Sequence, residues 1–121
     1  MAQYIKTEEG YKEFSIVTED KMDKTNPTGT GSFSMNRKAG TVIGTNSHAE
    51  GDNTTASGPY SHAEGNETRA SGIVSHAEGF YTKASGDYSY AEGYWTTASG
   101  VHSHAEGYLT TASGGYSHAE G

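Results

Sequence analysis

The chain has 121 residues, no cysteine, 17 glycines and a formal net charge of −7 at pH 7. Leu, Ile, Val and Phe together number 12, which is too few to fill a conventional hydrophobic core and offset the entropy lost on folding. The acidity argues against a nucleic-acid binder, no apolar run is long enough for membrane insertion, and the lack of cysteine excludes disulfides.

Residues 1–31 form the first predicted unit, an N-terminal segment that ends in a linker. Its opening sequence, MAQYIKTEEGYKEF, is too charged for a secretory signal, so we expect no signal peptide in this chain. Residues 13–17 (EFSIV) favour a short strand, and residues 21–31 are typical of a linker or turn. A helix over residues 7–24 is an alternative, but this stretch lacks a clear apolar stripe.

Residues 32–46 are predicted to be an atypical capping rung. Ser32-Phe33-Ser34-Met35-Asn36 imitates the block Ser-His-Ala-Glu-Gly that follows it, and residues 40–44 imitate a second block. Phe33 and Met35 fall at the His and Glu positions, where they would form an apolar plug. Terminal repeats are often atypical in this way.

Residues 47–121 are built from a repeat of 14 residues. Ser-His-Ala-Glu-Gly recurs with one variant, Ser-Tyr-Ala-Glu-Gly at Ser89, and Thr-x-Ala-Ser-Gly lies between successive copies. Two variable residues follow each block. A fixed period predicts a solenoid and outweighs the disorder that the composition alone indicates, and a period of 14 suits one turn of a β-solenoid.

Alternation of side chains along each strand predicts the cross-section. Ser47 and Ala49 would face inward from the first block, with His48 and Glu50 outward, and Thr and Ala would face inward from the second. We therefore expect an all-β fold, a flattened parallel β-roll with two five-residue strands per rung. The glycine that ends each block is expected to supply the unusual backbone angles of the corners.

Such a roll is too thin to be stable alone, because its small inward side chains bury little apolar surface, so we expect it to pack against another chain. The outward His and Glu positions are nearly uniform among the repeats whereas the spacers vary, which marks this face as the subunit interface. We expect the histidines to donate hydrogen bonds to the glutamates, on the same or a neighbouring chain. The predicted interface consists of Phe33, Met35, His48, Glu50, His62, Glu64, His76, Glu78, Tyr90, Glu92, His104, Glu106, His118 and Glu120.

The unit Ser-His-Ala-Glu-Gly-x-x-Thr-x-Ala-Ser-Gly resembles the head repeat of YadA-like trimeric autotransporter adhesins, whose first block reads roughly Ser-Val-Ala-Ile-Gly. It is more similar still to the SHAEG-repeat proteins of phage and prophage tail or neck appendages. The resemblance covers residues 47–121 well and 32–46 weakly. It implies a left-handed parallel β-roll assembled as a homotrimer, and His and Glu in place of Val and Ile imply a polar interface.

Neither catalysis nor a cofactor is expected, because no unique constellation of reactive residues stands apart from the repeat. His-x-Glu along one strand is a poor metal motif, so we also expect no metal, although stacked histidines could gather Zn²⁺ or Ni²⁺.

The spacers carry aromatic residues at one corner of three successive repeats. They predict either stacked rings that cover the edge of the roll or a strip that contacts a host-surface glycan or receptor, and we favour the former. The residues of this strip are Phe80, Tyr81, Tyr94, Trp95 and Tyr108.

The sequence as a whole favours a non-enzymatic shaft or head segment of a trimeric phage or prophage appendage, located on the virion or outside the cell. The alternative is the head of a bacterial autotransporter-type adhesin. An ice-binding solenoid is a third reading, disfavoured because Arg69 and Lys83 interrupt the outward threonine column. The chain stops directly after a repeat, so we expect it to be a fragment of a longer protein.

Overall fold

The computed structural model describes residues 3–7, 10–14, 32–38 and 40–121. In the N-terminal segment, β1 (Gln3–Thr7) and β2 (Gly10–Phe14) pair as an antiparallel hairpin. The alternative helix over residues 7–24 is therefore wrong where this stretch is described. The strand expected at 13–17 overlaps β2 only at residues 13–14, and residues 15–17 and the linker at 21–31 lie outside the described residues.

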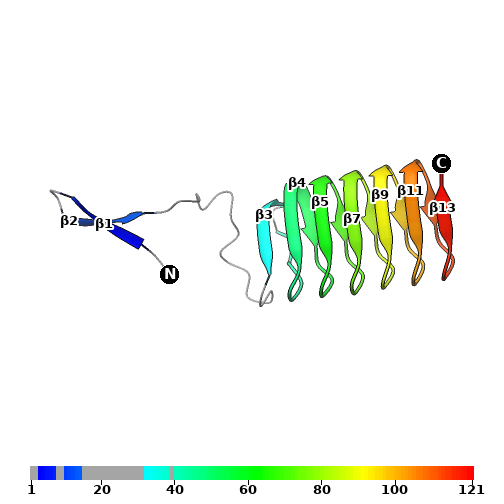
Figure 1. The fold of residues 1–121 in the computed structure, drawn as a ribbon, viewed down its shortest axis with the longest axis horizontal. Coiled ribbons are helices and arrows are strands. Elements are labelled where there is room, and N and C mark those ends of the chain that lie inside the picture. Colours follow the sequence, from blue (N-terminus) through cyan, green and yellow to red (C-terminus); the bar gives the residue numbers. More distant parts are fainter. Residues whose placement is uncertain (1–2, 8–9, 15–31, 39) are drawn as a thin grey trace.

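From residue 32 onward the chain winds as a parallel β-solenoid, with rungs following one another along the long axis (Figure 1). Its strands are β3 (Phe33–Arg37), β4 (His48–Ala56), β5 (His62–Asn66), β6 (Arg69–Ala70), β7 (His76–Phe80), β8 (Lys83–Ala84), β9 (Tyr90–Tyr94), β10 (Thr97–Ala98), β11 (His104–Tyr108), β12 (Thr111–Ala112) and β13 (His118–Glu120). The prediction of an all-β parallel solenoid is confirmed. No helix among the described residues is long and apolar enough to cross a membrane.

The rungs stack in the register that the repeat predicts. First-block strands pair in the order β4-β5-β7-β9-β11-β13 and second-block strands in the order β4-β6-β8-β10-β12. Each regular pair is offset by one repeat, so that His48 lies opposite His62 and Ala56 lies opposite Ala70. β4 continues through a corner and belongs to both ladders, and together with β3, which pairs with β4, they make one 11-stranded sheet.

The interior contains the small residues expected there. The alanines of both blocks, from Ala49 to Ala112, are 0–2% exposed, and the first Ser or Thr is buried beside them in all but the last copy of each block. Ile43 is the one larger aliphatic side chain in this cluster among the described residues, and it lies at the N-terminal end of the alanine column. Val42 is exposed instead, so residues 40–44 follow the second block less closely than the sequence indicates.

The prediction of two five-residue strands per rung is correct in length for most first-block strands and wrong for the second block. First-block strands start at the histidine and run into the first spacer, as in His62–Asn66, whereas second-block strands contain only two residues. The second ladder ends early because the N–H groups of Ser57 and Gly58 both point to one acceptor, the carbonyl of Ala70.

The corners also differ from the prediction that the last glycine of each block supplies the unusual angles. The first-block glycines do so, with φ between 107° and 116°, but the left-handed residue of every corner is the second spacer, such as Trp95 at φ 57°. The second-block glycines are needed for another reason. A Cβ on Gly86 would overlap the carbonyl oxygen of Gly100 in the next rung.

Candidate functional site

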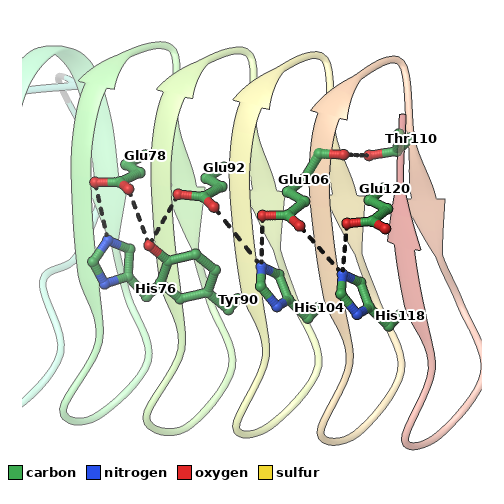
Figure 2. Close-up of polar contacts among 9 residues, drawn as sticks. All are labelled: His76, Glu78, Tyr90, Glu92, His104, Glu106, Thr110, His118 and Glu120. Carbon is green, nitrogen blue, oxygen red and sulfur yellow. Dashed lines mark hydrogen bonds and ion pairs between the residues drawn. The ribbon is translucent and has the colours of Figure 1, made fainter.

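The outward face of the first-block strands carries an unbroken column of rings, part of which is shown in Figure 2. The in-register ladder brings the same repeat position of successive rungs together. His48 and His62 stack with centroids 4.7 Å apart, and Tyr90 takes the histidine position at 4.6 Å from His76. His104 and His118 are parallel within 2°. The predicted ring positions thus form one contiguous surface.

A column of carboxylates runs beside the rings, two residues further along each strand (Figure 2). Each histidine in the column places Nε2 3.4–4.0 Å from a carboxylate oxygen of its own rung or of the rung before. Most of these separations are too long for a hydrogen bond, and Nε2 of His48, His62, His76 and His104 is buried without one. Imidazole and carboxylate lie together as predicted, but at ion-pair distance within a single chain.

Tyr90 is the point where the ladder is joined by direct hydrogen bonds. Its hydroxyl lies 3.0 Å from Oε1 of Glu78 and 3.2 Å from Oε2 of Glu92, and it donates to these carboxylates (Figure 2). Tyr90, which stands where the other repeats have histidine, is thus a hydrogen-bond donor beside Glu92. The bond to Glu78, in the preceding rung, links two rungs through side chains.

The carboxyl groups of neighbouring rungs influence one another in pairs. A hydrogen bond between the Glu64 and Glu78 carboxyls raises the pKa of Glu64 and, with the Tyr90 hydroxyl, lowers the pKa of Glu78 to about 2. The contact between Glu92 and Glu106 raises the pKa of Glu92 and lowers that of Glu106 in the same way. Each pair therefore favours holding a single proton, as adjacent carboxylates do.

The histidine column favours the neutral form at its centre. Burial, followed by repulsion from His76 and His48, lowers the pKa of His62 below its usual value. A neutral imidazole carries no charge to balance a carboxylate, and the Tyr90 hydroxyl adds hydrogen bonds to two carboxylates of the column.

The imidazole and carboxylate face is half-exposed in the single chain, with histidine side chains 30–53% exposed. A groove of about 1360 Å³ runs along it and is lined by the glutamate and the glycine of each first block, from Glu50 to Gly121. The glycines line it with backbone atoms alone, because a Cβ there would overlap the carbonyl of the next rung. Sequence analysis missed this groove, although the fixed glycine after each glutamate is its signal.

The two apolar residues of the capping rung align with this face as expected. β3 pairs with β4 so that Phe33 lies opposite His48 and Met35 opposite Glu50. The Phe33 ring meets His48 edge-on at 4.9 Å and extends the ring column by one member. The Met35 side chain lies outside what the structure describes.

The aromatic spacers gather into two adjoining stacks at one corner. Phe80, Tyr94 and Tyr108 stack at 5.0 and 5.2 Å, and Tyr81 stacks on Trp95 at 4.8 Å. Tyr81, Tyr94, Trp95 and Tyr108 are 42–61% exposed. The rings stack on one another, which is the arrangement that the sequence favoured, and their outer edges remain open to solvent.

Comparison with protein families agrees with this geometry. The model described as the YadA head domain repeat matches in two copies, at residues 38–61 and 84–103. No curated protein and no solved structure matches the chain. The two matched copies together with the parallel β-solenoid support placing these repeats in the YadA-like β-roll superfamily.

Proposed function

We propose that this chain is a non-enzymatic structural segment of a homotrimeric extracellular appendage, the head or shaft of an adhesin-type protein. Three copies meet through the imidazole and carboxylate face, and the roll winds left-handed. The number of chains and the hand come from the resemblance to YadA-like heads. The observation that carries the proposal is the half-exposed face of uniform composition that continues over every regular rung.

The energetics support association. The interior holds small side chains and one Ile, so a lone roll buries little apolar area for each ordered residue. The open groove along the carboxylates offers space that a second copy can fill, and the lowered pKa of His62 reduces the positive charge that association would bury there.

The oligomeric state tests the proposal. Sedimentation equilibrium of the chain, whose mass is 12.8 kDa, should give three times that mass. Glu78→Lys should dissociate the trimer because it sets a cation in the proposed interface. Lys83→Glu, a charge change of the same size and opposite sign on a second-block strand, should leave it intact. A wild-type protein that is folded by circular dichroism but has the mass of one chain would refute the trimer, even where Glu78→Lys fails to fold.

Two kinds of appendage are compatible with this architecture. The SHAEG form of the block favours a tail or neck appendage of a phage or prophage, so that the segment would reside in the virion. A bacterial autotransporter-type adhesin head is the alternative. The full-length reading frame distinguishes them, because a C-terminal membrane anchor decides for the adhesin.

The stacked corner rings support a second role, contact with a host-surface glycan, because exposed aromatic faces pack well against sugar rings. Trp95→Ala should abolish binding on a glycan array. Tyr60→Ala is the matched control, since Tyr60 has the same backbone conformation (φ 58° against 57°) and similar exposure at the other corner. Equal glycan binding by Trp95→Ala and wild type would leave these rings a purely structural role.

A further inference from the structure

Three clusters on the imidazole and carboxylate face bring nitrogen and oxygen atoms of different side chains within 4.8 Å of one another. Each cluster draws on two adjacent rungs. The clusters are His48, Glu50 and His62; Glu64, His76 and Glu78; and His104, Glu106 and His118.

The last cluster is the clearest. One oxygen of Glu106 lies 3.7 Å from Nε2 of His104 and the other lies 3.4 Å from Nε2 of His118 (Figure 2). Two ligand atoms bound at 2.0–2.1 Å to one tetrahedral ion are about 3.3 Å apart. The observed spacing is long for a hydrogen bond but close to that of two ligands of one metal ion.

The chemistry of these atoms also fits a metal. Imidazole nitrogen and carboxylate oxygen are the ligands that Zn²⁺ takes beside thiolate, and an imidazole binds a metal in its neutral form. Nε2 of His48, His62, His76 and His104 is buried without a hydrogen-bond partner, so no hydrogen bond of that atom has to break for it to bind an ion. A divalent cation would also neutralise the carboxylate column, where like charges are forced together by the ladder.

We propose that the imidazole and carboxylate columns bind Zn²⁺, or another divalent first-row ion with the same ligand preference, at up to three sites per chain. Each site bridges two rungs, and water completes the coordination. The stacked rings must turn about their Cβ–Cγ bonds for both lone pairs to meet one ion, which their partial exposure permits. All ligands of a cluster belong to one chain, so the sites do not rest on the proposed trimer.

The position of Tyr90 explains why the sites are interrupted. A neutral phenol replaces the imidazole in that rung, and its hydroxyl forms hydrogen bonds with Glu78 and Glu92. None of the three clusters described above includes Glu92. The sequence pointed away from a metal because His-x-Glu on one strand sets two ligands in a line. The structure adds the third ligand from the neighbouring rung, at a distance that the linear motif does not show.

Calorimetric titration of the whole, chelator-stripped chain with Zn²⁺ tests the proposal. We expect saturable binding of up to three ions per chain, and with Co²⁺ the intense visible absorption of a tetrahedral site. His104→Ala combined with His118→Ala, or Glu106→Gln alone, should lower the stoichiometry by one. His102→Ala is the control, because His102 stacks between Tyr88 and Tyr116 at the opposite corner and should leave binding unchanged. Tyr90→His should raise the stoichiometry.

Absence of saturable binding, or an equal loss of sites in His102→Ala and in the cluster variants, would overturn the proposal. Circular dichroism verifies that each variant is folded. If the alanine variants unfold, the test relies on Glu106→Gln, which keeps the shape of the side chain and removes its charge. The mass of the stripped protein separates the two proposals. A stripped trimer that binds no zinc refutes only the metal sites, and a folded single chain that binds zinc refutes only the trimer.

Discussion

At the scale of single residues, the interior is unusual for its buried hydroxyl groups. Oγ1 has no hydrogen-bond partner in four threonines that are at most 1% exposed, so water does not replace the missing partner. They are Thr54, Thr68, Thr82 and Thr96. Thr110 occupies the same repeat position but donates to the carbonyl of Glu106 at 3.0 Å. The threonine hydroxyl at this repeat position therefore has a hydrogen-bond acceptor in one rung and none in four others.

This contrast predicts opposite effects of one substitution. Thr82→Val removes an unpaired buried hydroxyl and keeps the β-branched shape, so it should raise the free energy of unfolding by about 1 kcal/mol. Thr110→Val removes a hydrogen bond and should lower it by a similar amount, about 1 kcal/mol. Urea denaturation of both variants measures the difference, and a loss of stability in Thr82→Val would show that its hydroxyl has a partner.

Tyr90 allows a prediction on pH. Hydrogen bonds from the Glu64 carboxyl and the Tyr90 hydroxyl lower the pKa of Glu78 from 4.5 to about 2. A carboxyl whose pKa is lower in the folded state stabilises the fold above its unfolded pKa, and this contribution is lost as the pH falls from about 4.5 toward 2. Tyr90→Phe removes one donor, so the pKa of Glu78 should rise toward 4.5, the stability that Glu78 contributes at neutral pH should be smaller, and its loss on acidification should be complete at a higher pH than in the wild type.

Carbon-13 NMR of the Glu78 carboxyl in metal-free protein measures this pKa directly. Tyr88→Phe is the control, since Tyr88 stacks on His102 away from the carboxylates and its substitution should leave Glu78 unchanged. An unchanged pKa of Glu78 in Tyr90→Phe would mean that the neighbouring carboxyls and His76, and not the Tyr90 hydroxyl, cause the shift.

At the scale of the rung, the last glycines of the first and second blocks have partly different structural roles. Both give the next rung room to approach, because a Cβ on either would overlap a carbonyl oxygen of that rung, and the first-block glycine in addition has φ above 100° and lets the strand enter its corner. Gly115, a first spacer, has no such restriction, because a Cβ there would meet no atom closer than 3.8 Å.

Gly86→Ala should therefore disrupt the stack. The added methyl group would overlap the carbonyl of Gly100, so the two rungs must separate, and we expect a loss of several kcal/mol, more than about 3. Gly115→Ala should change stability by less than about 0.5 kcal/mol. Thermal unfolding followed by circular dichroism compares them, and similar melting temperatures would contradict the close approach.

Much of the rung could be predicted from the sequence, because a period of 14 with small residues at alternate positions fixes both register and facing. The inward Ser, Thr and Ala and the adjacent His and Glu followed directly. The backbone of the corners did not follow, since left-handed angles fall on Val74, Trp95 and Leu109, which propensity disfavours there. Backbone hydrogen bonds between rungs, such as Trp95 N–H to the carbonyl of Phe80, hold these residues in place.

The chemistry of the face was predicted less completely than its location. Which residues share it follows from period-two spacing, but the distances between rungs depend on side-chain rotamers that spacing does not determine. The Tyr90 hydroxyl reaches back to Glu78, which is 12 residues away in sequence, as well as forward to Glu92. Proton sharing between Glu64 and Glu78 likewise arises only from the stack.

At the scale of the molecule, the solenoid is a one-dimensional array in which each regular rung contacts only its neighbours. Its stability should then be nearly a sum of equal contributions from successive interfaces. Length is set by the number of rungs, because strands in a ladder are about 4.8 Å apart.

Duplicating residues 75–88 within the chain tests this directly. The extra rung should lengthen the molecule by about 4.8 Å in small-angle X-ray scattering and raise the urea midpoint, since it adds one interface without a new end. The matched control is the same insertion without Asp87, which leaves one corner a residue short and breaks the ladder beside it. If both insertions alter stability equally, the array is not held together by in-register stacking, because only the full repeat preserves the column of alanines, the column of rings and the corner hydrogen bonds together.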